Sequence, residues 1–117
     1  MRDFWKQLET NDEVFRSFLD RRERLNALCR RYGVRRLDIF GSVNTVGEFD
    51  SEKSDLDFVV EFEPTRDLGP WLKHYFDFKE ELERLFERKV DLVMSSALKH
   101  PLFVREVNRT RALLYAA

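Results

Sequence analysis

The chain has 117 residues, of which 43% are hydrophobic and 37% charged, and its formal net charge is −1. This length fits one domain with one core, and the apolar content excludes an intrinsically disordered chain. The near-zero net charge favours neither nucleic acid nor an anionic membrane as a partner. A single cysteine excludes an internal disulfide, and no apolar run reaches membrane-spanning length. We therefore expect a cytoplasmic protein without a membrane segment.

The N-terminal third has the periodicity of helices. Phe4, Trp5 and Leu8 indicate a short amphipathic helix. Apolar residues then recur at intervals of three and four between residues 12 and 32, which predicts one long helix with a single buried face. Gly33 is expected to end this helix.

Strands and helices alternate in the rest of the chain. Runs rich in β-branched and aromatic residues predict strands over residues 34–40, 56–62 and 90–94. Pro70 begins a helix between the last two strands, and Pro101 opens a final helix that continues through Leu113 and Leu114.

This order predicts an α+β fold, with a mixed sheet of three or more strands flanked by helices. We expect residues 1–117 to form one domain, with an N-terminal helical extension over about residues 1–33.

Charge is distributed unevenly along the chain. Residues 1–36 carry ten basic and six acidic side chains, a balance of +4, whereas residues 37–63 carry one basic and eight acidic side chains, a balance of −7. Crowded carboxylates repel one another unless cations neutralise them, and a bound metal is one such cation. The arginines between residues 21 and 36 could contact an acidic partner, but the interspersed Asp20 and Glu23 favour a solvated helix face.

Asp55 and Asp57 are two positions apart at the start of a predicted strand, so their side chains point to the same face. Paired carboxylates of this kind can hold Mg²⁺, which prefers oxygen ligands and completes its shell with water and substrate phosphates. Alone, this pair is also common as solvated positions on a strand edge.

Asp91 and the dipeptide Gly41-Ser42 are further candidate site residues beside Asp55 and Asp57. Asp91 interrupts an apolar strand, where a carboxylate costs free energy unless it is paired or ligated. It could be a third metal ligand, a general base, or a partner of Lys89 or Arg88 in a structural ion pair. Gly41-Ser42 follows a strand, where backbone N–H groups and a hydroxyl can approach an anion.

Together these segments resemble the minimal nucleotidyltransferases of the DNA polymerase β superfamily, many of which are antitoxins paired with HEPN-domain toxins. The resemblance extends from about residue 34 to residue 117. It rests on three segments, which are Phe40-Gly41-Ser42, residues 54–60 and residues 89–93.

The resemblance implies roles for these residues. Gly41 and Ser42 would hold a nucleoside triphosphate, whereas Asp55, Asp57 and Asp91 would bind Mg²⁺ and act as the catalytic carboxylates. The implied activity is transfer of AMP from ATP to a hydroxyl, which in the antitoxins is a tyrosine of the partner toxin. The sequence leaves the oligomeric state open, and a homo-oligomer is compatible with it.

The loop after Ser42 departs from the family pattern. The family usually continues with Ala-Arg-Gly, whereas this chain continues with residues 43–47, Val-Asn-Thr-Val-Gly, and twelve residues separate Ser42 from Asp55. Lys53 could substitute for the missing arginine. The altered loop suggests one alternative, a catalytically weak antitoxin that neutralises its toxin by contact. A separate and weaker option is transfer to a small molecule or to nucleic acid.

Overall fold

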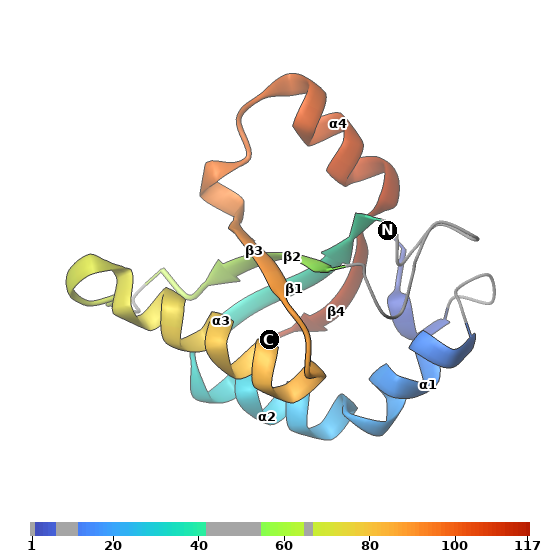
Figure 1. Cartoon of the computed structure of the whole chain (residues 1–117). Coiled ribbons are helices and arrows are strands. Elements are labelled where there is room, and N and C mark those ends of the chain that lie inside the picture. The colour runs from blue at the N-terminus through green and yellow to red at the C-terminus, as the bar shows by residue number, and fades with distance from the viewer. Residues whose placement is uncertain (1, 7–11, 42–54, 65–66) are drawn as a thin grey trace.

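The computed structural model describes residues 2–6, 12–41, 55–64 and 67–117. In these residues a four-stranded sheet forms the middle of the molecule, with α-helices packed on both of its faces (Figure 1). This arrangement confirms the predicted α+β class and the mixed sheet. None of the helices in these described ranges is long and apolar enough to cross a membrane.

The strand order in the sheet is β3-β2-β1-β4. The strands are β1 (Val34–Phe40), β2 (Leu56–Phe62), β3 (Val90–Met94) and β4 (Ala112–Ala116). β1 pairs antiparallel with both β2 and β4, whereas β2 and β3 are parallel. The parallel pair requires a crossover, which α3 supplies.

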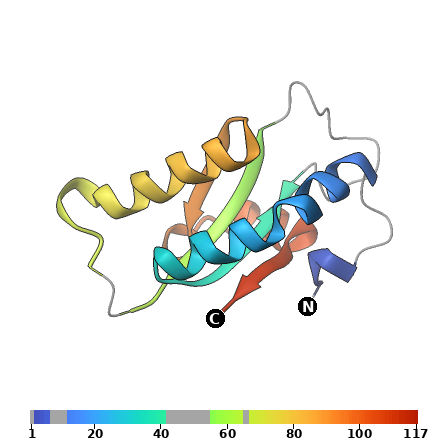
Figure 2. The ribbon, with the colours of Figure 1, turned by 90° about the horizontal axis from the view of Figure 1, so that it is seen from below.

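One face of the sheet is covered by α1 (Asp12–Asp20), α2 (Arg22–Arg31) and α3 (Lys73–Phe86) (Figure 2). Alternate residues of each strand point to this face and pack against the buried stripes of the helices. The resulting core includes Phe4, Phe18, Leu25, Cys29, Leu37, Ile39, Phe58, Val60, Phe78 and Leu82. Burial raises the pKa of the Cys29 thiol to about 12, which fits packing and not reactivity.

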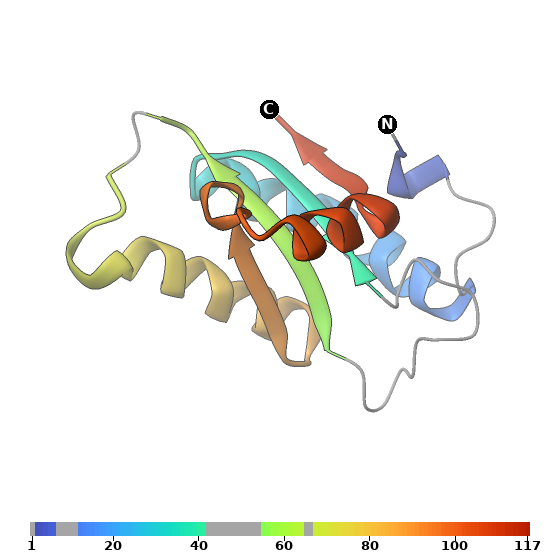
Figure 3. The same cartoon turned by 90° about the horizontal axis from the view of Figure 1, so that it is seen from above.

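The other face of the sheet carries α4 (Pro101–Thr110) and the short 3-10 helix Ser95–Ala97 (Figure 3). A small second cluster lies beneath it, in which Val107 of α4 packs against Phe40 of β1 and Val59 of β2. Because Val59 belongs to this cluster while its neighbours Phe58 and Val60 belong to the main core, strand alternation also directs Asp57 to the α4 face.

The long N-terminal helix predicted over residues 12–32 is divided in two at Arg21. Arg21 leaves the helical conformation, with φ −107° and ψ 2°. Its guanidinium donates hydrogen bonds to the carbonyl oxygens of Leu85 (2.8 Å) and Ser17 (3.0 Å). The break is therefore stabilised by a contact with the end of α3, which the helical periodicity does not reveal.

The final helix also ends earlier than predicted. It stops at Thr110, and residues 112–116 form strand β4 along β1. Leu113 and Leu114, assigned by sequence to the helix, are therefore strand residues. The N-terminal segment lies along the edge of β4 that faces away from β1. There the Leu113 N–H donates a hydrogen bond to the Arg2 carbonyl (2.8 Å), and the Trp5 indole N–H donates one to the Leu114 carbonyl (2.8 Å).

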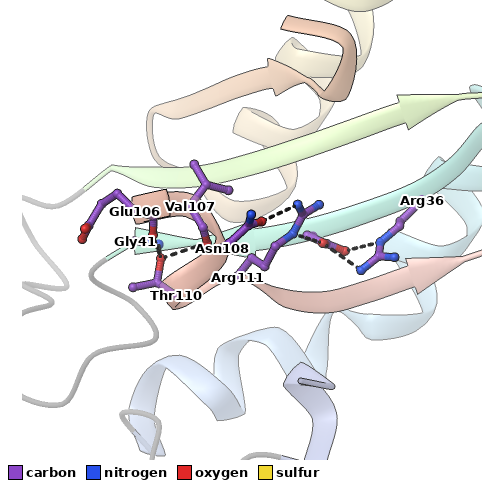
Figure 4. A network of polar contacts seen from close by, with 8 residues as sticks. Arg36, Gly41, Glu106, Val107, Asn108, Thr110 and Arg111 are labelled. Carbon is purple, nitrogen blue, oxygen red and sulfur yellow. Dashed lines mark hydrogen bonds and ion pairs between the residues drawn. The ribbon is translucent and has the colours of Figure 1, made fainter. Parts of the chain in front are cut away.

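A buried carboxylate joins β1 to the end of α4. Asp38 is fully buried, and its two oxygens accept hydrogen bonds from Arg36 (2.9 Å) and Arg111 (2.6 Å). Arg111 follows the last residue of α4 and also donates to the Asn108 side chain (3.1 Å) (Figure 4). A buried carboxylate is tolerated only with such partners, so this network fixes where α4 ends on the sheet.

We predict that Asp38→Ala lowers the free energy of unfolding by about 2–4 kcal/mol, because two guanidinium groups lose their shared buried partner. Urea unfolding monitored by circular dichroism measures this change. Glu61→Ala is the matched control, since it removes an exposed ion pair with Arg35 and should cost less than about 1 kcal/mol. Equal costs for the two variants would show that the Asp38 network is not a structural anchor.

Candidate active site

Strand register brings two of the predicted carboxylates together. On β2, Asp57 lies between Phe40 of β1 and Asp91 of β3, and it is paired with both in the register of the sheet. Gly41 follows Phe40 directly. The end of β1 and the beginnings of β2 and β3 therefore meet at one end of the sheet, on the face that carries α4.

Gly41 lies in contact with the Asp57 carboxylate. Its backbone has φ +86°, a conformation that favours glycine. A Cβ atom added at Gly41 would lie 2.5 Å from Oδ2 of Asp57, closer than real Cβ atoms approach, so the carboxylate or the backbone would have to shift. Glycine is therefore favoured here both by the backbone conformation and by the adjacent carboxylate.

Asp57 and Asp91 form a carboxyl pair. Asp57 is half-buried and Asp91 is exposed, and their side chains are hydrogen-bonded to each other. Burial, the hydrogen bond to Asp91 and the negative charges of Asp91 and Asp55 together raise the pKa of Asp57 from 3.8 to about 7. Two carboxyl groups in contact disfavour simultaneous ionisation, so a proton or a cation between them is stabilising.

The pair has the chemistry of a site for a divalent cation. Its donors are hard oxygen atoms, and a cation could replace the shared proton. Asp55 is exposed and acts on Asp57 through its charge. Within the described ranges, no three His, Cys, Asp or Glu side chains are grouped so as to hold a metal ion. A three-ligand site formed by Asp55, Asp57 and Asp91 therefore stays a prediction.

Two predicted features lie outside the described residues, namely Ser42 and the loop that contains Lys53. The structure instead adds two residues that sequence reasoning did not select. Thr110 accepts a hydrogen bond from the Gly41 N–H (2.9 Å). Tyr75 donates to the Leu92 carbonyl, and burial and the charge of Asp91 raise the pKa of its phenol. Neither residue has a local sequence signal, because both contacts join segments distant in the chain.

Paired carboxylates at one end of a mixed sheet, next to a glycine with positive φ, fit the site that the resemblance to nucleotidyltransferases implies. The profile of the family described as "Nucleotidyltransferase domain" matches residues 21–114. The chain belongs to this family, which confirms the resemblance to minimal nucleotidyltransferases. The match begins at Arg21, so it includes α2 as well as the sheet.

Named relatives agree with the family assignment. The chain is 43% identical over 72 residues to the protein adenylyltransferase MntA of Thermococcus cleftensis. The aligned residues cover 62% of this chain and 67% of the relative. It is 36% identical over 86 residues to a candidate protein adenylyltransferase of Methanocaldococcus jannaschii. The aligned residues cover 74% of this chain and 82% of that relative.

Solved structures share the fold. One described as a candidate minimal nucleotidyltransferase is 34% identical, with a TM-score of 0.64, over 82% of this chain and 91% of that one. A toxin–antitoxin structure with AMP-PNP has a TM-score of 0.60 at 18% identity, over 82% of this chain and 73% of that one. A Shewanella oneidensis complex of an AMPylated HEPN toxin with an MNT antitoxin has a TM-score of 0.57 at 18% identity, over 85% and 72% of the two chains.

We predict that Gly41→Ala destabilises the protein by about 2–4 kcal/mol, because it adds a steric clash with Asp57 to the cost of a positive φ. Gly69→Ala is a matched control, since Gly69 has a φ of +75° but its nearest neighbour would lie 3.9 Å from an added Cβ. Thermal unfolding of both variants measures the difference. If Gly41→Ala is no more destabilising than Gly69→Ala, the close approach of Gly41 to Asp57 is not present in solution.

We predict that Asp57→Asn raises the melting temperature of the protein in EDTA at pH 8. The folded-state pKa of Asp57 is about 7, above the ordinary value of 3.8, so ionisation removes stability as the pH rises through this range. The gain from Asp57→Asn should therefore shrink as the pH falls below 7 and vanish below the ordinary pKa of 3.8, where the carboxyl is protonated in both states. Asp67→Asn, at an exposed turn, is the control. A gain that does not change with pH would contradict the raised pKa.

Proposed function

We propose that the protein transfers a nucleoside monophosphate, AMP from ATP, to a hydroxyl group of a protein. The observation that carries this proposal is the Asp57–Asp91 carboxyl pair held against the Gly41 backbone. The family supplies the reaction class, and two relatives above 30% identity carry the name of protein adenylyltransferase.

In the proposed reaction the acceptor oxygen attacks the α-phosphorus of ATP, and the bond from this phosphorus to the bridging oxygen of the β-phosphate breaks. Pyrophosphate leaves, and the hydroxyl proton passes to a carboxylate or to water. In this reaction Asp57 and Asp91 would act at the acceptor and the α-phosphate, and one of the carboxylates or a water molecule would take up the proton. Gly41 and Ser42 would contact the triphosphate.

Asp55, Asp57 and Asp91 would hold Mg²⁺, which suits their oxygen donors. A divalent cation bound there would stabilise the negative charge that develops on the triphosphate. This assignment is supported by the contact between Asp57 and Asp91 and by the charge that Asp55 places nearby.

We further propose that the acceptor is a tyrosine of a HEPN-domain toxin and that the protein is its antitoxin in the cytoplasm. The support is the name MntA of one relative and the toxin–antitoxin composition of several structures with this fold. The whole chain would act as one domain, with α1 and α2 packed into its core. The altered loop after Ser42 favours one alternative, in which the protein neutralises its toxin by contact alone.

The test is Mg²⁺-dependent labelling of a partner protein by ATP labelled at the α-phosphate. The wild type should label a co-expressed toxin or a protein band in a lysate. Asp57→Asn should reduce the labelling rate by about two orders of magnitude or more, because one charged group at the reacting centre is lost. Asp67→Asn should label at the wild-type rate, since its exposed side chain lies in the turn before α3.

A parallel growth assay separates the alternatives. If Asp57→Asn no longer labels the toxin and no longer protects cells from it, transfer is the protective activity. If Asp57→Asn still protects, the contact-only antitoxin is correct. Absence of labelling by folded wild-type protein with any nucleotide would contradict the proposed transferase.

A further inference from the structure

The hydroxyl of Thr110, the last residue of α4, reaches the glycine turn of the active site. The residue is only 3% exposed, and Oγ1 accepts a hydrogen bond of 2.9 Å from the backbone N–H of Gly41 (Figure 4). Oγ1 also lies 3.2 Å from the Glu106 carbonyl oxygen and 3.5 Å from that of Val107. Because a hydroxyl has one donor and two acceptor sites, it can donate to its own helix while it accepts from Gly41.

The position of Thr110 is fixed by the sheet itself. The next residue, Arg111, forms an ion pair with the fully buried Asp38 of β1 (2.6 Å), and its N–H donates to the Val107 carbonyl (2.8 Å). The side chain of Val107, on the buried side of α4, also packs against Phe40, the residue before Gly41. The helix end therefore presents the hydroxyl from an anchored element, which is how precise positioning is achieved in binding sites.

The Gly41 backbone that Thr110 contacts also lies close to Asp57. Gly41 lies against the Asp57 carboxylate, with room for hydrogen but not for a methyl group. A rotation of the Phe40–Gly41 peptide would change the contact of Gly41 with Asp57. The hydrogen bond from the Gly41 N–H to Thr110 opposes such a rotation.

We propose that Thr110 is a positioning residue for nucleotide binding, whose hydroxyl orients the Gly41 backbone beside Asp57 without touching the substrate. This inference rests on the proposed role of Gly41 and Ser42 in holding the triphosphate. It assigns to α4 a role in the active site that is distinct from covering the sheet.

The test compares Thr110→Val, which keeps the shape of the side chain but removes the hydroxyl, with Thr110→Ser, which keeps the hydroxyl. Thr110→Val should raise KM for ATP in the presence of Mg²⁺ about 5–10-fold, the value of one hydrogen bond, and change kcat by less than about twofold. Thr110→Ser should stay within about twofold of the wild type. Ser96→Ala, which removes an exposed hydroxyl beyond β3, is the control.

Two readouts do not depend on turnover. Equilibrium binding of a non-hydrolysable ATP analogue should weaken by the same factor in Thr110→Val. Amide hydrogen exchange at Gly41, measured by NMR on the nucleotide-free protein, should be faster in Thr110→Val and unchanged in Thr110→Ser. Melting temperatures show whether each variant is folded.

The outcomes distinguish the positioning role from the proposed function. If wild type and Thr110→Val bind nucleotide and exchange the Gly41 amide equally, the positioning role is wrong while the transferase stands. If Thr110→Ser is impaired as much as Thr110→Val, the methyl packing and not the hydroxyl matters, and the proposal is overturned. If the wild type binds no nucleotide, both the proposed function and this role fail, even when Gly41 exchange differs between the variants.

Discussion

The pairing of β2 with β1 on one side and β3 on the other is the constraint on which the candidate site depends. This register places Asp57 opposite both Phe40 and Asp91, so two carboxyl groups and the Gly41 backbone meet at one end of the sheet. A slip of one residue in β2 would turn Asp57 toward the helices and Phe58 toward α4. The same alternation that buries Leu56, Phe58 and Val60 therefore also positions the carboxyl pair.

The two faces of the sheet differ in what they contribute, one to stability and the other to the candidate site. The face covered by α1, α2 and α3 holds most of the apolar core and so most of the stabilising burial. The α4 face holds a small apolar cluster, the buried Asp38 network and the carboxyl pair. The unfavourable proximity of Asp57 and Asp91 is maintained by the stability of the opposite face, which is a common relation between a functional site and its fold.

The sequence was sufficient to predict strands β1 to β3 and the helix α3, because strand alternation and apolar burial are local signals. It also selected Asp57 and Asp91 as candidate site residues, but their adjacency follows from the parallel pairing of β2 with β3. It was insufficient for the break at Arg21 and for β4. The break depends on a hydrogen bond to Leu85, and β4 depends on pairing with β1, so both are set by distant segments. Asp38 had the same signal as Asp91, an acid inside an apolar strand, yet its partner Arg111 could not be identified before the fold was known.

The central claim is that Gly41, Asp57 and Asp91 form one cation-dependent nucleotide site. The most direct measurement is NMR line broadening by substoichiometric Mn²⁺, a paramagnetic substitute for Mg²⁺, with and without a non-hydrolysable ATP analogue. The account predicts the strongest broadening at the amides of these three residues, weaker broadening at Glu61 roughly 13 Å along β2, and a stronger effect with the analogue. Broadening centred on exposed acids elsewhere, such as Glu80 on α3, and insensitive to the analogue would contradict it.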